Sequence, residues 1–329
     1  MIEVLSTLPL NTVQDLGRFG ARHYGVSTCG VMDPVAFVVG NVLVGNPDNA
    51  AAIEVQTFPF VVRFLADTSF AVTGADTAAT LDEHEVPPWW SSTAHRGQTL
   101  TLRPPASGAR AYLALSGGID VPVILGSRST HLRSEFGGFE GRSLEQGDVL
   151  RTLDGEVASP ASRKSAGLGV VPPAFALPPR GAKASDKVLP VRVLRAGEYD
   201  LFPVAMQERF WATDWKITHH SDRGGYRLSG QPLKLAAPVE LRSYGLIAGI
   251  VQVPPSGEPI IQMSDANTAG GYPKIATVIE ADLWRLGQTR LGSYIRFEDV
   301  TYEHAIDAMA PVVAYLAQIR RTTELYRSL

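Results

Sequence analysis

Cysteine is almost missing from this 329-residue chain, since Cys29 is the only one. One cysteine forms no internal disulfide, so the composition gives no indication of an oxidising compartment. The sequence also has no apolar run long enough to span a membrane, and its N-terminus has no basic stretch before an apolar one. We therefore expect a cytoplasmic protein that works without a membrane partner.

Strong charge of either sign is missing as well. Charged residues make up 19% of the chain, the formal net charge is −3, and Lys and Arg form no block. A nucleic-acid-binding surface needs clustered positive charge, so this composition excludes nucleic acid as a partner. Small neutral or acidic ligands and other proteins remain.

Several motifs of nucleotide and metal chemistry are absent. The sequence has no Gly-x-x-x-x-Gly-Lys-Ser/Thr loop, no Cys-x-x-Cys pair and no His-x-x-x-His pair. His219 and His220 lie close to Asp222, but adjacent residues on a strand point to opposite faces, so they do not favour one shared metal ion. No metal site is predicted, and a nucleotide, if used, is not held by a P-loop lysine.

Glycine and proline, in contrast, are plentiful. The chain has 31 Gly and 23 Pro, and its apolar residues, 45% of the total, fall in short β-branched runs between turn residues. This pattern favours a β-barrel or sandwich over a helical bundle. A polar-glycine turn followed by alternating polar and apolar residues, typical of an antiparallel strand, occurs at residues 96–102, 146–150 and 291–297. We expect a mainly β protein with a few helices.

Two helices are predicted within this β-rich sequence. Asp33 can cap the first, which begins at Pro34 and ends before Gly45, and its almost entirely apolar composition predicts that it is buried. The second covers about residues 302–320, where apolar side chains recur at helical spacing. Pro311 should bend or interrupt it.

The length of the chain favours two domains. Between about residues 154 and 187 the composition shifts to Ala, Pro, Ser, Gly, Lys and Arg with little apolar periodicity, which is typical of a linker. The predicted division is a first domain at residues 1–153, a linker at 154–187, and a second domain at 188–329 that ends in the C-terminal helix.

The densest set of recognition residues is the loop 265–273, with the sequence Asp-Ala-Asn-Thr-Ala-Gly-Gly-Tyr-Pro. β-prone runs precede and follow it, so it should join two strands. Paired glycines let a backbone approach a ligand closely, tolerate a positive φ and expose amide donors. Considered alone, the loop is equally consistent with a tight turn.

A second set of candidate residues lies near the N-terminus. Arg18 can clamp a carboxylate or phosphate through two parallel hydrogen bonds, and His23 can exchange a proton near neutral pH. Alternatively, Asp15 and Arg18 form a pair that braces the turn at Gly17. Arg128, also in a turn, is a second anion-clamp candidate, with a surface ion pair as its alternative.

Seven short segments resemble those of a known family, in the same order along the chain. They are residues 12–18, 25–34, 115–120, 125–130, 221–228, 252–257 and 265–273. The family is that of the C subunit of 5-oxoprolinase, also called KipI antagonist (KipA), allophanate hydrolase subunit 2, or the carboxyltransferase-domain family of urea carboxylase. The resemblance extends from about Thr12 to about Val300 and does not choose among the family's activities.

Three positions depart from the pattern of this family. Gly224 stands where a methionine is usual, and Ala269 stands where many relatives have a second threonine hydroxyl. Cys29 stands where relatives often have serine. It is more consistent with a small buried residue than with a nucleophile, because no activating base is identifiable beside it.

The resemblance implies two tandem cyclophilin-like β-barrel domains. Because polar loops on two linked barrels favour an interdomain site, we expect Arg18 and His23 to approach the loop 265–273 in a shared cleft. Catalytic roles are expected for Arg18, His23 and Asp265. Substrate or phosphate contacts are expected from Arg128, Asp222, Arg223, Tyr226, Gln252, Asn267, Thr268, Gly270, Gly271 and Tyr272. Tyr226 is equally consistent with an aromatic residue of a barrel core.

The resemblance further implies one half of a two-protein module that uses ATP with Mg to activate a stable amide or lactam. The reaction that we expect first from this resemblance is the cleavage of 5-oxoproline, a small cyclic amide, to glutamate. The implied partner is the B subunit of the enzyme, also called KipI or allophanate hydrolase subunit 1, and the two proteins would form a heterotetramer. The ATP would be bound mainly by residues of this partner. An A subunit, similar to LamB/YcsF, would complete the reaction. Phosphorylating an amide oxygen needs positive groups and fixed donors facing it, which Arg18, Arg128, Arg223 and the Gly270 and Gly271 amides would supply.

Alternative activities stay open at this point. An allophanate hydrolase or a biotin-dependent carboxyltransferase is one; the biotin would be carried by another chain, since this one has no Met-Lys-Met segment. A regulatory protein that binds a KipI-like kinase inhibitor is the non-enzyme alternative. Prolyl isomerase activity rests on analogy with a barrel alone.

Overall fold

A computed structural model describes residues 1–153, 167–173, 188–237 and 239–328. Its contacts divide the chain into two compact units. Unit 1 consists of residues 1–18, 29–180 and 313–329, and unit 2 of residues 19–28 and 181–312. The chain thus passes between the units several times, and not only through the linker expected at 154–187.

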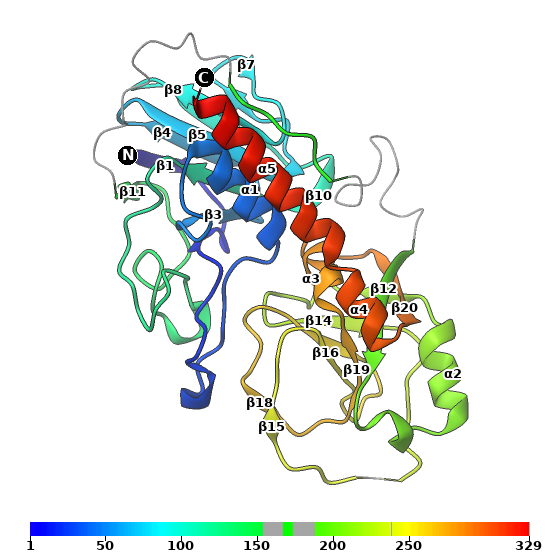
Figure 1. The fold of residues 1–329 in the computed structure, drawn as a ribbon. Coiled ribbons are helices and arrows are strands. Elements are labelled where there is room, and N and C mark those ends of the chain that lie inside the picture. Colours follow the sequence, from blue (N-terminus) through cyan, green and yellow to red (C-terminus); the bar gives the residue numbers. More distant parts are fainter. Residues whose placement is uncertain (154–166, 174–187, 238, 329) are drawn as a thin grey trace. The chain divides into compact units, whose positions relative to one another are not determined.

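Unit 1 is built from two β-sheets (Figure 1). The first has the strand order β11 (Val149–Leu150), β1 (Ile2–Ser6), β4 (Phe60–Phe64), β9 (Thr99–Leu102), β6 (Thr80–Leu81) and β7 (His84–Glu85). The second has the order β2 (Thr12–Gln14), β3 (Ala52–Val55), β10 (Ser107–Leu115), β5 (Thr68–Asp76) and β8 (Trp90–Ala94). Neighbouring strands in both sheets run antiparallel.

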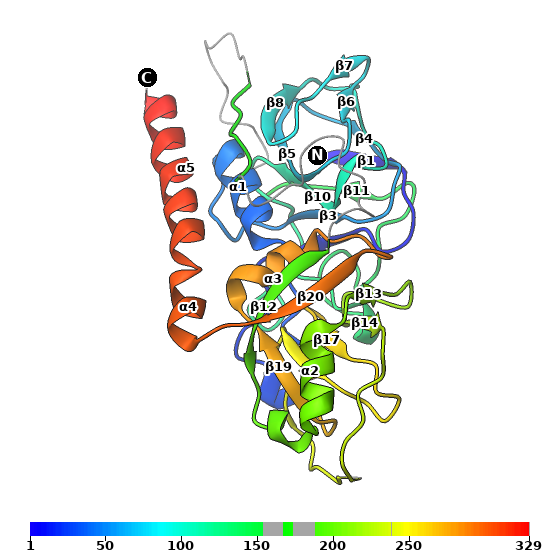
Figure 2. The ribbon, with the colours of Figure 1, turned by 90° about the vertical axis from the view of Figure 1, so that its right-hand side faces the viewer.

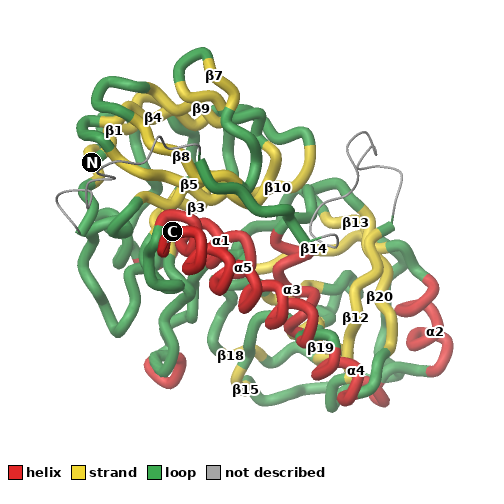
Figure 3. Tube along the Cα trace, turned by 45° about the horizontal axis from the view of Figure 1, so that its top comes forward, coloured by secondary structure: helices red, strands yellow, loops and turns green. Residues whose placement is uncertain are grey.

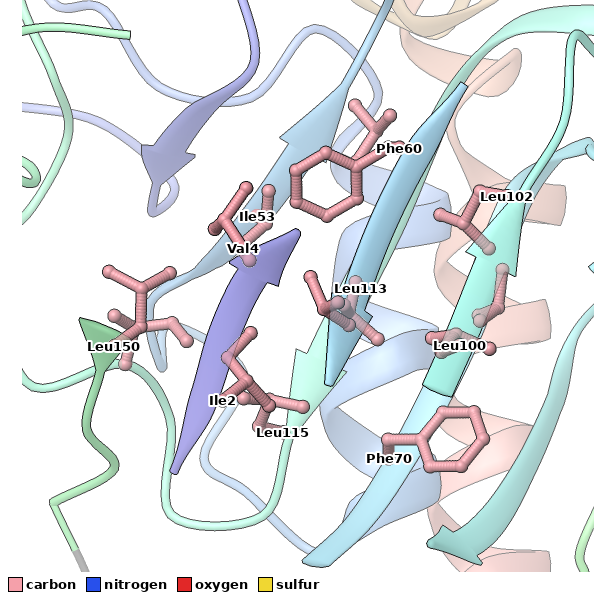
Figure 4. Packing of buried hydrophobic residues seen from close by; sticks show 14 of the residues in the cluster. Ile2, Val4, Ile53, Phe60, Phe70, Leu100, Leu102, Leu113, Leu115 and Leu150 are labelled. Carbon is pink, nitrogen blue, oxygen red and sulfur yellow. The ribbon is translucent and has the colours of Figure 1, made fainter. Parts of the chain in front are cut away.

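The hydrophobic core of unit 1 is formed by side chains from both sheets. Figure 4 shows Ile2 and Val4 of β1 and Phe60 of β4 among residues of β3, β5 and β10. The strands alternate buried and exposed positions where only one face is covered, as in β4. This alternation places one face of each sheet in the core.

Helix α1 (Pro34–Val44) forms where the sequence predicted it. The Asp33 carboxylate accepts the Ala36 N–H at 3.0 Å, Pro34 occupies the first turn, and Gly45 ends the helix with a left-handed φ of 84°. Such a cap satisfies an amide that has no partner inside the helix. All residues of α1 after Pro34 are buried, and the helix contacts β5 and β10, so the prediction of a buried helix is confirmed.

The second predicted helix is interrupted near Pro311, as expected. It consists of α4 (Tyr302–Asp307) and α5 (Ala310–Ser328). From Val313 onward α5 belongs to unit 1, although the sequence suggested that it completes the second domain. Figures 1 and 2 both show it beside α1.

Two arginines of α5 account for its assignment to unit 1. Arg327 donates to the Val42 and Leu43 carbonyls at the C-terminus of α1, at 3.1 and 3.0 Å, and Arg320 pairs with Asp48. A cation at this end of a helix is favourable because the last carbonyls lack partners inside the helix and carry partial negative charge. α5 therefore caps α1 from outside.

Unit 2 contains a closed seven-stranded barrel. The strand order is β12 (Leu189–Arg195), β19 (Lys274–Val278), β16 (Ile250–Gln252), β17 (Ile260–Gln262), β14 (Gly225–Ser229), β13 (Trp215–Ile217) and β20 (Tyr294–Asp299). β12 and β20 are parallel, and the other neighbours are antiparallel. The remaining regular elements are α2 (Val204–Ala212), α3 (Glu280–Gly287) and a two-stranded sheet of β15 (Tyr244–Gly245) and β18 (Ala269–Gly270).

The prediction of a mainly β chain with few helices is confirmed (Figure 3). The three turn-into-strand segments enter β9, β11 and β20. Most of the predicted linker lies outside the described residues. Its described part, residues 167–173, is hydrogen-bonded to β8 through Leu168 and Ser91, so unit 1 extends beyond residue 153.

The burial of α1 makes a testable prediction. Val38 is 5% exposed, so Val38→Asp places a charge in the core and should destabilise the protein by several kcal/mol, roughly 3–5. Val313→Asp is the control, since Val313 of α5 is 59% exposed and the same change there should cost about 0.5 kcal/mol. Thermal melts of both variants measure the difference. Equal melting temperatures would show that α1 is not packed as described.

Candidate functional site

The loop 265–273 leaves β17 and enters β19, as the flanking runs predicted. Its centre, β18, pairs with β15, and the Leu246 N–H donates to the Thr268 carbonyl at 2.9 Å. Asn267 and Tyr272 are exposed, whereas Pro273 is buried. The loop is thus fixed at its centre and at its exit while polar and aromatic side chains face solvent.

A bidentate ion pair fixes the start of the loop. Arg223 Nε and Nη2 each donate to one Asp265 carboxylate oxygen at 2.9 Å. The Arg223 side chain is 4% exposed and the Asp265 side chain 17%. Two parallel hydrogen bonds match the planar guanidinium to the carboxylate, which makes this pair geometrically specific. Both predicted site residues are therefore occupied with each other in this structure.

The segment around Arg223 lies against the same loop. The Asp222 carboxylate accepts the Gly224 and Gly225 N–H groups at 2.8 and 3.1 Å, which forms a tight turn. The Asp265 N–H donates to the Arg223 carbonyl at 2.9 Å. The structure thus brings together two segments that the sequence placed in one site.

The two loop glycines are required by close packing. Neither has a positive φ, which corrects that part of the sequence interpretation. A Cβ on Gly270 would lie 2.8 Å from Leu246 Cδ1 and 2.9 Å from Gln252 Nε2, and one on Gly271 would lie 2.9 Å from the Leu241 carbonyl. These distances are shorter than any normal contact, so a side chain at either position would displace the loop.

A lysine that the sequence did not single out lies behind the loop. Lys274 is 3% exposed, and its Nζ donates to the Gly270 and Tyr272 carbonyls, each at 3.2 Å. The same Nζ lies 3.4 Å from the centre of the Tyr244 ring, which is a cation–π contact. Burial lowers the pKa of Lys274, and the nearby Glu198 carboxylate partly opposes this shift.

Glu198 and Tyr244 complete the surroundings of this lysine. The Glu198 carboxylate accepts the Lys274 backbone N–H at 3.1 Å and the Tyr244 hydroxyl at its other oxygen. Burial and this carboxylate raise the pKa of Tyr244 to about 12. We call Lys274, Glu198 and Tyr244 the lysine cluster.

Two buried glutamines support the loop from the barrel. Gln252 Nε2 donates to the Tyr272 carbonyl at 3.2 Å, and Gln262 Nε2 donates to Gln252 Oε1 at 3.1 Å. The Tyr272 carbonyl therefore accepts from both Gln252 and Lys274. Tyr226 is fully buried, which agrees with the interpretation as a barrel-core aromatic.

The segment 19–28 belongs to the same unit as the loop. The Ser27 hydroxyl donates to the Ala266 carbonyl at 2.6 Å, which ties the segment to the start of the loop. His23 is exposed, and its ring lies 3.8 Å from that of Tyr24. His23 is thus an accessible titratable group on a segment anchored to the loop.

Arg18 lies in unit 1 and is fully buried. Its Nε and Nη2 donate to the Ile124 and Ser129 carbonyls, both at 2.9 Å, and its guanidinium lies 4.8 Å from the Phe136 ring centre. Because the whole side chain is inside the protein, the structure gives Arg18 a bracing role in place of the exposed anion clamp that the sequence favoured.

Asp15, three residues before Arg18, binds the loop at residues 127–129. Its carboxylate accepts the Gly17 N–H, the hydroxyls of Ser127 and Ser129, and the Arg128 N–H, at 2.6–2.9 Å. The Arg128 side chain donates to the Val121 carbonyl at 3.2 Å. Asp15 therefore braces the turn at Gly17, one of the two roles considered for it, through backbone and hydroxyl groups.

The candidate site is thus the part of unit 2 formed by the loop 265–273, the turn 222–225, the segment 19–28 and the lysine cluster. Arg18 and Arg128 belong to unit 1, so the shared interdomain cleft stays a prediction. Within the described ranges, no group of three His, Cys, Asp or Glu residues could hold a metal ion. In the same part of the chain, no helix is long and apolar enough to cross a membrane.

Comparisons with known proteins find relatives along almost the whole chain. The family model of the carboxyltransferase domain, subdomain A and B, matches residues 24–299. The C subunit of 5-oxoprolinase from Haemophilus influenzae is 41% identical over 98% of this chain and 99% of its own. That of Escherichia coli is also 41% identical, over 97% of both chains.

A solved structure shows the same fold. The crystal structure of K. lactis urea amidolyase matches 97% of this chain with a TM-score of 0.86 at 30% sequence identity. This chain covers only 20% of that longer protein. The protein described here belongs to the carboxyltransferase domain family, subdomain A and B.

The ion pair of Arg223 and Asp265 makes a prediction about stability. Asp265→Ala leaves a buried guanidinium without its carboxylate, so it should destabilise the protein by about 3–5 kcal/mol. The matched control is Asp299→Ala, which removes the carboxylate paired with the 54%-exposed Arg195 and should cost at most about 1 kcal/mol. Urea unfolding of both variants measures this. Similar losses in the two variants would contradict the burial of the Arg223 pair.

The lowered pKa of Lys274 predicts a pH dependence. Between this pKa and the ordinary value of 10.5, the unfolded chain binds more protons than the folded one, so the contribution of Lys274 to stability increases as pH rises. The free energy of unfolding of the wild type relative to Lys274→Met should therefore increase as pH rises towards 10.5. Urea unfolding at a series of pH values checks the slope. A relative stability that falls with rising pH would contradict the assigned shift.

Proposed function

We propose that this protein is the C subunit of a 5-oxoprolinase, an enzyme complex that opens the lactam of 5-oxoproline to give glutamate. One observation carries the proposal: two relatives, each named as the C subunit of 5-oxoprolinase, match it at 41% identity over almost the whole of both chains. The match spans nearly the full length of both relatives.

The chemistry of the candidate site suits this reaction. An amide carbonyl resists attack by water, and charge develops on its oxygen as the bond is broken, so fixed N–H donors facing that oxygen lower the barrier. The loop 265–273 offers backbone amides held rigidly by buried side chains. His23 offers an accessible imidazole for proton transfer, whereas Asp265 is engaged by Arg223.

We further propose that the reaction is ATP-dependent and that ATP and Mg are bound mainly by residues of a KipI-like B subunit. The described acidic groups at the candidate site support this division of labour. Asp265 and Asp222 are hydrogen-bonded to Arg223 and to the turn glycines, and Glu198 is bonded to Lys274 and Tyr244. They do not form a carboxylate set suited to Mg. A LamB/YcsF-like protein, the A subunit, would complete the complex.

Carboxyl transfer is the second candidate. It is favoured by the match of 97% of this chain to urea amidolyase and by the name of the matched family. In that case the substrate would be a small amide such as urea, and the carboxyl group would arrive on biotin carried by another chain. The loop 265–273 would bind the substrate oxygen equally well there, so the two functions differ in the partner.

Reconstitution with purified partners tests this choice. We expect the protein and its KipI-like partner to form a stable complex, a heterotetramer by size-exclusion chromatography with light scattering. With the LamB/YcsF-like protein added, the complex should produce glutamate from 5-oxoproline only when ATP is present. Separate elution at micromolar concentration would overturn the complex. ATP-dependent carboxylation of urea with a biotinylated carrier, abolished by avidin and without glutamate formation, would favour the second candidate.

A further inference from the structure

The ammonium of Lys274 contacts the loop 265–273 at two backbone carbonyls. These carbonyls belong to Gly270 and Tyr272, and Lys274 Nζ lies 3.2 Å from the oxygen of each. The Tyr272 carbonyl accepts a second hydrogen bond from Gln252. The orientation of this part of the loop is therefore fixed from behind.

The planarity of the peptide bond gives this orientation a consequence. In a trans peptide the C=O of one residue and the N–H of the next point in opposite directions. The Gly270 carbonyl points at Lys274, so the Gly271 N–H points away from it. The Tyr272 carbonyl precedes Pro273, which has no N–H, so of the two peptides whose carbonyls bind Lys274 only Gly270–Gly271 has an N–H, and this N–H points away from the lysine.

The surroundings of Gly271 allow a ligand to reach this amide. Gly271 is partly exposed and lies just beyond β18, whose last residue, Gly270, is paired with Tyr244. The Leu241 carbonyl and the Ser243 hydroxyl lie on the side where a Cβ would be, at 2.9 and 3.4 Å from it. The absence of a side chain therefore keeps the amide open and places a hydroxyl beside it.

We propose that Lys274 is a positioning residue that turns the Gly270–Gly271 peptide so that the Gly271 N–H binds an oxyanion of the substrate. The effect of Lys274 on turnover rests on the proposed function, whereas its effect on oxyanion binding does not depend on it. The oxyanion is either the substrate carboxylate or the lactam oxygen as it gains charge. Lys274 acts through the peptide and does not touch the substrate.

The other members of the lysine cluster hold the ammonium in place. The Tyr244 ring covers one side of Nζ, and Glu198 binds both the Tyr244 hydroxyl and the Lys274 backbone. Charge attraction to the ring and to Glu198 keeps the lysine under the loop although it is buried. An apolar residue would fill the same space as Lys274. The contacts within the lysine cluster explain how a buried cation is stabilised there instead.

Selective NMR labelling observes the Gly271 amide directly. With glycine labelled both at ¹³C′ and at ¹⁵N, an HNCO spectrum contains only Gly–Gly peptides, and the sequence has four: 117–118, 137–138, 224–225 and 270–271. In the full-length wild type, inorganic phosphate should shift the 270–271 signal and leave 117–118 and 137–138 in place. In Lys274→Met the 270–271 signal should no longer respond. Lys216→Met, an exposed lysine of the same barrel, is the control and should respond like the wild type.

Two further ligands identify the source of the oxyanion. 5-Oxoproline has both a carboxylate and a lactam, and 2-pyrrolidinone has the lactam alone. A shift of the 270–271 signal with 5-oxoproline only assigns the carboxylate to Gly271, and a shift with both ligands assigns the lactam oxygen. Either result supports the proposal.

Kinetics of the reconstituted complex separate positioning from a purely structural role. Lys274→Met should lower kcat by about 100-fold with KM within about threefold if Gly271 binds the lactam oxygen, because that interaction strengthens as charge develops. It should raise KM with kcat nearly unchanged if Gly271 binds the carboxylate, whose charge is constant. Lys216→Met, the exposed-lysine control of the same barrel, should stay within about threefold of the wild type in kcat. Melting curves confirm that both variants are folded.

The outcomes distinguish the two proposals. A 270–271 signal that ignores phosphate in the wild type, or that responds equally in folded Lys274→Met, overturns the role of Lys274. A Lys274-dependent phosphate response in a complex that does not turn over 5-oxoproline supports the oxyanion site and overturns the proposed reaction. If Lys274→Met does not fold, Lys274→Gln, which retains one donor, replaces it and should show a reduced response.

Discussion

Buried cations that satisfy the carbonyls of irregular loops are the interaction on which both units depend. A loop inside a protein exposes backbone oxygens that no sheet partner binds, and leaving them without a donor costs free energy. In unit 1 Arg18 serves the Ile124 and Ser129 carbonyls, and in unit 2 Lys274 serves those of Gly270 and Tyr272. Each cation binds two backbone carbonyls of a loop and holds that part of the loop in place.

The two cations differ in what surrounds them. Arg18 presents a planar fork stacked against Phe136. Lys274 is a compact charge between a ring and a carboxylate, and its pKa is lowered by burial. An arginine stays charged under all ordinary conditions, whereas a buried lysine is sensitive to its environment. The loop 265–273 of unit 2 is therefore held by the cation whose charge depends more on its surroundings.

The sequence predicted the features that local chemistry decides. Helix α1 was predicted because Asp33 and Pro34 specify its start and Gly45 its end, all by local signals. The limits of the loop 265–273 followed from the β-prone runs on either side. The resemblance placed Arg223 and Asp265 in one site, but their pairing across 42 residues was not predicted.

Features that depend on distant contacts were not predictable. Arg18 carries no local mark of its burial, because the carbonyls it binds are more than a hundred residues away. The glycines of the loop were open to a positive φ, and only the positions of Leu246, Gln252 and Leu241 show that crowding is the constraint. Lys274 stands at the start of an apolar run, where a charged residue is typical of the exposed end of a strand. The presence of a charge beside this apolar run was therefore the one feature of the sequence that could have indicated a buried lysine under the loop.

The assignment of α5 to unit 1 affects how the protein is made. Unit 1 begins at the N-terminal side of the chain, yet Arg327, which binds the last carbonyls of α1, lies beyond the whole of unit 2 in the sequence. Domains usually fold as they emerge from the ribosome, the N-terminal one first. Here Gly45 can end α1 as soon as it is made, whereas the contacts of Arg327 with the Val42 and Leu43 carbonyls form only after the second unit has been synthesised.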